Sequence, residues 1–337
     1  MRILLCTFVA WLKSLGPWIC LKKKQLLYRK QCFGLSFALR WIIVEIEKKM
    51  AHRWSDKWRA NRHEHYVIEQ YLIRKGYLDF MMNIVNCSDD IKNQDLTVIG
   101  NNCPIWVCWW QGENSMPPIV KKCYERLLRM RGEHKVILIT GDNYREYVDI
   151  PKQLIKKAEK GLLQYAHLAD LLRLKLLAKN GGLWIDSTIY CSHVIDDIYT
   201  NCIFMSLRNP PYFNDNVSSY RWTSYFLGST VNVYVTALAE TMQQYLLTEK
   251  AVIHYFLIDY LIDLLYKASK DFRLMIDNLP LRNPHLQSLF DLRNEQFNQQ
   301  VWDEMMNDTD FFKTSYRMTG VDIVDGKESF YSHIVNQ

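Results

Sequence analysis

Short apolar runs alternate with longer amphipathic runs through the middle of the chain. Residues 104–110 and 135–140 are almost entirely apolar, which is typical of strands buried in a parallel sheet. Residues 116–130 and 149–160 follow these runs with helical periodicity, and the prolines that open the first of them suit a first helical turn. This alternation of strand and helix predicts an α/β fold.

The same kind of pattern continues toward the C-terminus. Apolar runs at 202–207 and 225–228 predict two further strands. Residues 231–247, 251–268 and 295–307 predict helices. No internal repeat interrupts this order, so we expect one α/β domain in this part of the chain.

Residues 169–188 combine a helical run, a stop signal and a short strand, and they read ADLLRLKLLAKNGGLWIDST. The helical run is expected to end at residues 180–182, because Asn-Gly-Gly is typical of a left-handed C-terminal cap. The apolar residues 183–185 then predict a strand. The segment is therefore one helix–turn–strand unit of the α/β pattern.

Three charged side chains stand out in this unit. Asp170 and Arg173 are three positions apart, which places them on one face of the predicted helix. Asp186 follows the predicted strand, and the carboxyl ends of strands in open α/β folds are where ligands bind. Taken singly, these residues have ordinary explanations: Asp170 and Arg173 as a surface ion pair, and Asp186 as an acid that forms a turn. Together they predict a binding site.

Two segments resemble a known family. Residues 166–188 (AHLADLLRLKLLAKNGGLWIDST) resemble the signature of the capsular polysaccharide synthesis family of glycosyltransferases, which is related to the DXD-motif sugar transferases. Residues 105–112 (IWVCWWQG) and 116–118 (MPP) resemble the first strand and the start of the first helix of that family. The resemblance runs from about residue 104 to the C-terminus and is thin after residue 229. It implies a GT-A-type, Rossmann-like nucleotide-sugar-binding domain behind an N-terminal helical extension.

The implied activity is transfer of a sugar from a nucleotide-sugar donor to a growing capsular or surface polysaccharide, or to another glycan or lipid-linked glycan, with retention of configuration. Such transfer must stabilise a departing diphosphate and hold an oxocarbenium-like sugar. The resemblance assigns Asp170 and Arg173 to the donor sugar and Asp186 to the diphosphate, and we take these three as the catalytic candidates.

The motif departs from the DXD pattern, because Asp186-Ser187-Thr188 lacks the second acid. Mg²⁺ usually keeps several waters and needs few protein ligands. The resemblance therefore leaves Mg²⁺ or Mn²⁺ as a possible cofactor, held by Asp186 with the Thr188 hydroxyl, and leaves the metal requirement open.

Further residues are assigned to the donor side of the site: Trp109, Trp110, Asp142, His167, Gly181 and Gly182. One of the two tryptophans is expected to stack on the base, because successive side chains in a strand point to opposite faces. Asp142 is also explained as a turn residue, and His167 as a core residue. No acceptor base stands out; Asp259 is either a contact of donor or acceptor or an ordinary helix-face acid.

The N-terminal fifth of the chain is strongly basic. Residues 1–62 carry 14 Lys and Arg against 3 Asp and Glu, although the whole chain is only +6. The apolar runs here are shorter than the roughly 20 residues of a membrane span. They predict basic amphipathic helices that lie on an anionic membrane surface or form a solvated cap. Nucleic-acid binding is not expected, because no known motif is present.

These patterns divide the chain into a basic helical extension over residues 1–95, which includes a polar linker at 83–102, and a catalytic domain over 96–337. Nine scattered cysteines without metal-binding spacing indicate a reduced, cytoplasmic protein, associated with the inner membrane face if the extension binds lipid. Two alternatives remain: a catalytically inactive binding protein on the same fold, and a peripheral membrane protein of polysaccharide assembly.

Overall fold

The structure is a computed structural model that describes residues 23–54, 57–87, 98–208 and 216–337. The strands are β1 (Pro104–Cys108), β2 (Lys135–Ile139), β3 (Gly182–Ile185), β4 (Ile189–Cys191), β5 (Phe204–Ser206), β6 (Phe226–Ser229), β7 (Phe311–Lys313), β8 (Ile323–Val324) and β9 (Lys327–Glu328). The helices before β3 are α2 (Leu35–Trp54), α3 (Lys57–Arg74), α4 (Tyr77–Cys87), α5 (Pro118–Met130), α6 (Tyr144–Tyr147), α7 (Lys152–Glu159) and α8 (Tyr165–Asn180). Those after it are α9 (Val233–Thr248), α10 (Leu257–Ala268), α11 (Lys270–Asp277), α12 (Ser288–Asp291), α13 (Gln299–Asp308) and α14 (Phe330–Asn336).

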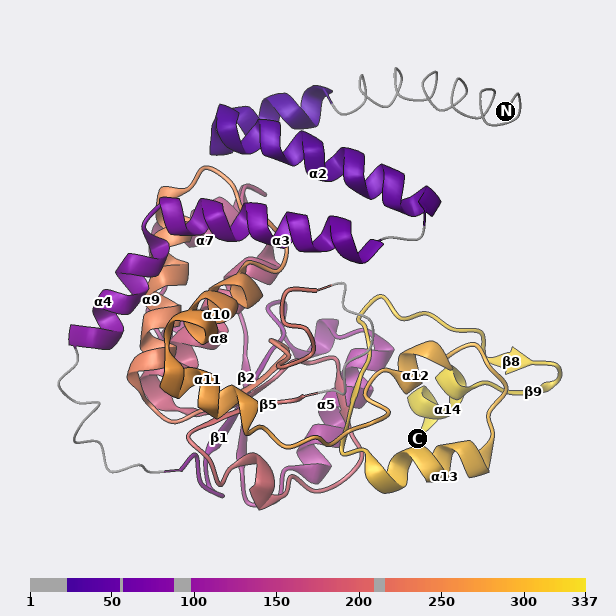
Figure 1. The fold of residues 1–337 in the computed structure, drawn as a ribbon. Helices are drawn as coiled ribbons and strands as arrows, with labels where there is room; N and C mark the ends of the chain where they lie inside the picture. Colours follow the sequence, from indigo (N-terminus) through magenta and orange to yellow (C-terminus); the bar gives the residue numbers. More distant parts are fainter. Residues whose placement is uncertain (1–22, 55–56, 88–97, 209–215) are drawn as a thin grey trace, which may run out of the picture.

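A five-stranded sheet in the order β2-β1-β3-β6-β5 forms the centre of the molecule (Figure 1). β1 runs parallel to β2 and to β3, whereas β6 is antiparallel to β3 and to β5. A second, two-stranded sheet joins β4 to β7. The α/β, Rossmann-like class predicted from the sequence is therefore confirmed, with each strand and helix predicted after residue 103 present within a few residues.

The largest departure among these helices is at the start of α10, which begins at Leu257 and not near residue 251. The Ile253 N–H donates to the Tyr245 hydroxyl, and the Tyr245 hydroxyl donates to the Ala251 carbonyl. These bonds to α9 hold residues 251–253 in a turn, so the local helical pattern does not extend through them.

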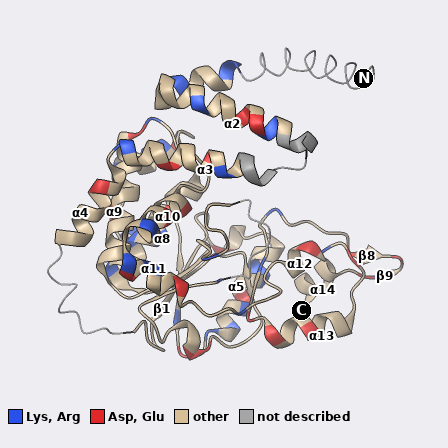
Figure 2. Cartoon of the chain, in the orientation of Figure 1, with Lys and Arg blue, Asp and Glu red and all other residues tan. Residues whose placement is uncertain are grey.

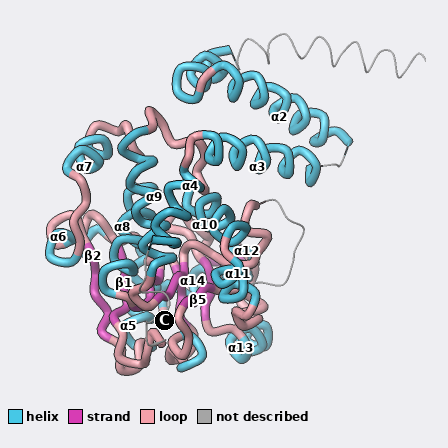
Figure 3. Tube along the Cα trace, turned by 60° about the vertical axis from the view of Figure 1, so that its left-hand side comes forward, coloured by secondary structure: helices cyan, strands magenta, loops and turns pink. Residues whose placement is uncertain are grey.

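Helices surround the sheet on both sides, and Figure 3 shows α8, α9 and α10 gathered together beside it. α8 packs on β1, β3 and β6, and α9 packs on α8. α5 contacts β4 and α14. β3 is buried along its whole length, as expected for a central strand covered on both faces.

The N-terminal helices are attached to this core. α2 packs on α3, α3 packs on α10, and α4 packs on α9 and α10. Tyr71 and Tyr77 donate hydrogen bonds of 2.8 and 2.9 Å to the buried Glu249 carboxylate, and the Lys75 ammonium lies 3.0 Å from it. α4 occupies the start of the predicted linker, so residues 83–87 are helical and that part of the linker prediction is wrong. Residues 88–97 of the linker lie outside the described residues.

α2 and the helix of residues 23–33 that precedes it form the outermost layer of the described chain (Figure 1). Phe37, Trp41 and Val44 face α3 and are buried. The opposite face carries an apolar stripe at helical spacing whose members are 44–55% exposed: Leu35, Leu39, Ile43 and Met50. Figure 2 shows basic residues on the helix of residues 23–33. None of the described helices combines the length and hydropathy needed to span a bilayer. Residues 1–22 of the basic extension lie outside the described residues.

Candidate active site

Asp186 lies on a tight turn at the carboxyl end of β3. Its N–H donates to the Tyr225 carbonyl, and its carbonyl accepts from the Ile189 N–H, both at 2.9 Å. These bonds fix the backbone between β3 and β4. The Asp186 side chain therefore leaves the sheet at its carboxyl edge, where ligands bind in folds of this type.

Arg173 joins two carboxylates that come from different elements. One terminal nitrogen lies 3.1 Å from Asp170 on α8, and the other donates to Asp186 Oδ1 at 2.9 Å. The guanidinium is almost fully buried and lies over the Trp184 ring, 4.9 Å from its centroid. The Trp184 indole N–H donates to the same Asp186 oxygen at 2.7 Å. The three catalytic candidates from the sequence are thus brought together in one cluster.

Lys313 at the end of β7 completes this cluster. Its ammonium lies 3.8 Å from Asp186 Oδ2, donates to the Thr188 hydroxyl and sits over the Tyr225 ring at 5.0 Å. Burial lowers the pKa of Lys313, and the nearby Asp186 carboxylate opposes that shift. The side chains of Lys313 and Asp186 are 23% and 27% exposed, so this pair is the part of the cluster that a ligand reaches.

Lys313 was not predicted as a site residue from the sequence, because 125 residues separate it from Thr188, which it contacts. The contact depends on the antiparallel pairing of β7 with β4, in which Lys313 is opposite Ile189. A signal was present, since a lone cation follows the apolar pair Phe311-Phe312 as a strand ends. Without the pairing partner, that signal did not indicate which site the lysine joins.

The donor set at the motif does not fit a divalent metal. Asp186 Oδ1 accepts from Arg173 and Trp184, and its Oδ2 faces Lys313. The Thr188 hydroxyl accepts from the same ammonium. Hard cations need oxygen lone pairs that point at the ion. Here Asp186 Oδ1 already accepts two hydrogen bonds, and the positive charges of Arg173 and Lys313 next to the carboxylate oppose the binding of a further cation. In the described part of the chain, no three His, Cys, Asp or Glu side chains are grouped to hold a metal.

The two tryptophans after β1 have different neighbours. Trp109 donates to the Ser115 hydroxyl at 2.9 Å and lies edge-on to Tyr316, at 6.4 Å between centroids, in the segment that follows β7. Trp110 packs on Tyr144 of α6, at 5.2 Å. The expectation that they diverge is met. Trp109 is the one beside the Lys313 segment, so stacking on a base stays a prediction for that residue.

Asp142 is exposed in the turn after β2. Its N–H donates to the Thr140 hydroxyl at 3.2 Å, and the Thr140 N–H donates to the Asn143 side chain at 2.8 Å. The structure therefore places Asp142 in the turn role that the sequence also allowed, and its contact with a donor stays a prediction.

His167 is buried on α8, one turn before Asp170. Its Nδ1 lies 3.8 Å from Asp170 Oδ2 and has no hydrogen-bond partner among the described residues. Its ring is 5.8 Å from that of Tyr255. Tyr255 is 58% exposed, and its pKa is raised by partial desolvation and then by the charges of Asp170 and Asp186. Tyr255 therefore covers the α8 side of the cluster, a position that its sequence context did not indicate.

Gly181 and Gly182 lie at the amino end of β3, and Asp186 follows its carboxyl end. A Cβ on Gly182, which has φ +101°, would come within 2.3 Å of the Pro104 carbonyl oxygen. The Gly181 carbonyl accepts from the Trp106 indole at 2.8 Å. These glycines allow close packing of β3 on β1, and the structure does not bring them together with the charged cluster, so their assignment to the donor is not supported.

Asp259 is buried on α10, where it accepts hydrogen bonds from Trp222 and Ser224 at 3.1 and 3.3 Å. Burial, and then the charge of Asp170, raises the pKa of Asp259 to about 7. It is therefore a buried carboxyl on α10 close to the cluster, and not the ordinary helix-face acid that its sequence context favoured.

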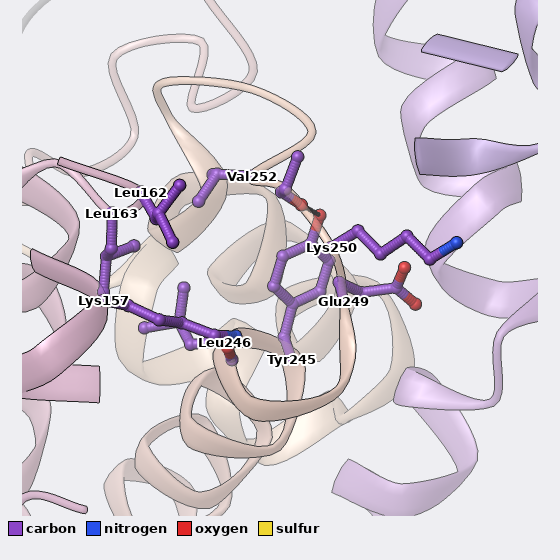
Figure 4. Close-up of a pocket in the computed structure, with 9 residues that line it drawn as sticks. Lys157, Leu162, Leu163, Tyr245, Leu246, Glu249, Lys250 and Val252 are labelled. Carbon is purple, nitrogen blue, oxygen red and sulfur yellow. Dashed lines mark hydrogen bonds between the residues drawn. The ribbon is translucent and has the colours of Figure 1, made fainter. Parts of the chain in front are cut away.

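A pocket of about 90 Å³ lies elsewhere, between α7 and the end of α9 (Figure 4). It is lined by apolar side chains such as Leu163, Leu246 and Val252, and Lys157 and Lys250 lie at its sides. Lys157 donates to the Leu246 carbonyl at 2.7 Å. None of the candidate catalytic residues lines this pocket.

A family model described as capsular polysaccharide synthesis protein matches residues 48–334. The chain belongs to this family, which confirms the resemblance seen in the sequence. The match begins within α2, so α3 and α4 lie inside the matched region.

A curated relative gives a more limited similarity. The chain is 31% identical over 108 residues to "O-glycosyltransferase braB" of Annulohypoxylon truncatum. The match covers 29% of this chain and 26% of that protein. The matched part therefore spans about a quarter of the relative. No solved structure matches the chain with significant similarity.

Proposed function

We propose that this protein is a glycosyltransferase that moves a sugar from a nucleotide-sugar donor to a growing surface polysaccharide or another glycan, including a lipid-linked one. The observation that carries the proposal is the cluster in which Arg173 joins Asp170 and Asp186 at the carboxyl edge of the sheet. Family membership and the name of the distant relative support the same class of reaction.

The carboxylates are the groups suited to the sugar. Ionised carboxylates accept hydrogen bonds from hydroxyls, and fixed acceptors hold a sugar in one pose. Both terminal nitrogens of Arg173 are engaged by Asp170 and Asp186, so Arg173 acts as the positioning residue that orients them. Its buried Nε has no partner among the described residues. An unsatisfied buried donor costs about 1–3 kcal/mol, and a ligand oxygen would remove that cost.

Asp186 is the accessible carboxylate of the cluster, and it already accepts hydrogen bonds from Arg173 and Trp184, so we assign it no role as a general base. In a retaining transfer, the departing phosphate oxygen takes the acceptor proton, so a strong protein base is not required. This agrees with a site whose accessible groups are Asp186 and Lys313. We therefore include retention of configuration in the proposal.

The α2 stripe favours action at the inner face of an anionic membrane. Exposed apolar residues such as Leu39 and Ile43 suit the acyl–headgroup boundary, and each basic residue near an anionic surface contributes about 1 kcal/mol. Residues 1–62 supply the complementary positive charge. A protein held at the membrane surface through α2 would be close to a lipid-linked acceptor.

The test is a panel of nucleotide sugars, for example UDP-glucose, UDP-galactose, UDP-N-acetylglucosamine and GDP-mannose. Donor hydrolysis and the midpoint of thermal unfolding are measured for the purified chain. We expect one donor to be hydrolysed and to raise the midpoint, because a ligand that binds only the folded state stabilises it. A rise without turnover favours the inactive binding protein, and no response to any donor contradicts the proposal.

A further inference from the structure

We propose that the Lys313 ammonium binds the departing diphosphate and takes the place of a divalent metal, so that sugar transfer by this protein needs no metal ion. This inference rests on the proposed function and names the group that serves its leaving group. The motif Asp186-Ser187-Thr188 lacks a second acid, and the Lys313 ammonium lies beside it, where a metal would neutralise the charge of the diphosphate.

Lys313 lies next to the turn that carries the motif. Asp186-Ser187-Thr188 forms the turn between β3 and β4, and Lys313 lies beside both ends of it. The pairing of β7 with β4 holds the lysine there, because Lys313 is opposite Ile189 in the register. The Thr314 N–H also donates to the Thr188 carbonyl at 2.9 Å, which anchors the lysine backbone to the motif.

The Lys313 ammonium has N–H groups left for hydrogen bonds to a ligand. An ammonium carries three N–H groups. One is used by Thr188, and the distance of 3.8 Å to Asp186 is longer than a direct hydrogen bond. Lys313 therefore has unused donors on a side chain that is 23% exposed. Arg173 differs, because carboxylates engage both of its terminal nitrogens and its side chain is only 6% exposed.

The charged groups around Asp186 favour an anionic ligand over a metal ion. Asp186 forms a set of one carboxylate and two cations with Arg173, at 2.9 Å, and Lys313, at 3.8 Å. A fixed positive charge aimed at a leaving group stabilises the transition state, and it does so more strongly in a partly buried site than in water. A divalent ion would instead face two protein cations at short range, which opposes its binding.

The transfer balances without a metal. The bond between the anomeric carbon and the phosphate oxygen breaks, and its electron pair stays on that oxygen. The acceptor hydroxyl oxygen forms the new bond to the anomeric carbon, and its proton moves to the departing phosphate oxygen. Lys313 stays protonated throughout and donates hydrogen bonds to the diphosphate, which leaves as a nucleoside diphosphate.

The experiment compares the wild-type chain with Lys313→Met and Lys313→Arg, and uses Lys327→Met, at an exposed lysine of β9, as the matched control. Donor hydrolysis is measured with and without EDTA, and with added Mn²⁺. Binding of UDP, GDP and the corresponding nucleosides is measured by calorimetry. Circular dichroism monitors folding.

We expect the wild-type rate to survive EDTA and not to depend on Mn²⁺. Lys313→Met should lower the rate about 100-fold or more, the size of effect seen when a fixed transition-state donor is removed. It should also weaken nucleoside diphosphate binding, but not nucleoside binding, and Lys313→Arg should retain part of both. Lys327→Met should match the wild type.

Two results overturn the inference while the proposed function stands: wild-type hydrolysis that disappears in EDTA and returns with Mn²⁺, or a Lys313→Met chain that binds the diphosphate as tightly as the wild type. The chelation measurement uses the wild-type chain, so it decides the matter even if Lys313→Met does not fold. A wild-type chain that neither binds nor hydrolyses any donor overturns the proposed function, and this inference with it.

Discussion

Arg173 donates a hydrogen bond of 2.9 Å to Asp186, although one lies in the middle of a helix and the other follows the next strand. The contact forms because α8 packs directly on β3, which brings the helix face against the carboxyl edge of the sheet. The same guanidinium binds Asp170 at 3.1 Å. A single buried cation thus sets the orientation of both carboxylates.

Replacing this cation tests the cluster. Arg173→Lys keeps the charge but loses the fork that reaches two carboxylates, and lysine does not reproduce such bidentate geometry. We expect the rate of donor hydrolysis to fall about 100-fold. Arg173→Met should also destabilise the fold by about 3–5 kcal/mol, because it leaves partly buried carboxylates unpaired. Lys179→Met, exposed on the same helix, is the control. A wild-type rate in Arg173→Lys would contradict the positioning role.

The indole of Trp184 gives a finer test. Trp184→Phe keeps an aromatic ring beneath Arg173 and removes only the N–H that donates to Asp186 at 2.7 Å. Hydrogen bonds to charged groups contribute about 1.5–3 kcal/mol. We expect kcat to fall about 10-fold or more and the free energy of unfolding to fall by about 1.5–3 kcal/mol. Unchanged kcat would show that the orientation of Asp186 does not limit the reaction.

The buried carboxyl of Asp259 predicts a pH dependence of stability. Its pKa is about 7 in the folded protein, against 3.8 ordinarily. Between these values the folded state keeps a proton that the unfolded state releases, so stability present below about pH 4 is lost as pH rises toward 7. Each unit of difference corresponds to about 1.4 kcal/mol.

Asp259→Asn removes this titration and keeps an acceptor for Trp222. The variant should be close to the wild type in stability at pH 4 and more stable at pH 8, as measured by thermal unfolding across that range. Curves that stay parallel at all pH values would show that Asp259 titrates normally.

Glu249 holds α3 and α4 to the core. Its carboxylate accepts from Tyr71 and Tyr77 and pairs with Lys75, and its side chain is 5% exposed. We expect Glu249→Ala to lower the free energy of unfolding by about 3–5 kcal/mol, because it removes one partner from a buried charged network. Glu295→Ala provides a less buried control. A loss below 1 kcal/mol would contradict this role.

The exposed stripe of α2 predicts membrane binding. Sedimentation with vesicles of phosphatidylcholine and 30% phosphatidylserine, a probe composition of our choosing, should pull down the wild-type chain at low salt, and the ~8 Å Debye length at physiological salt should weaken it. Leu39→Glu with Ile43→Glu should abolish binding and leave donor hydrolysis unchanged. Leu162→Glu, at an exposed leucine elsewhere, should have no effect. Binding that survives the double substitution would contradict the proposed surface.

Local patterns were sufficient for most of the fold. The apolar runs of β1 and β2, and the cap after α8, depend on neighbours within a few residues, so these elements were predicted close to their observed bounds. Asp170 and Arg173 were predicted to share a face because helical spacing alone places them together. The domain boundary near residue 95 stays a prediction.

The amino-acid sequence by itself determined the α/β class, the family and the three charged residues of the motif, because spacing along one helix and one strand encodes them. Only the tertiary structure decided that Lys313 joins Asp186 and that Gly182 serves strand packing. Those relationships depend on which strands pair and how closely they approach, and pairing between distant segments is decided by burial of the whole core, which no local pattern contains.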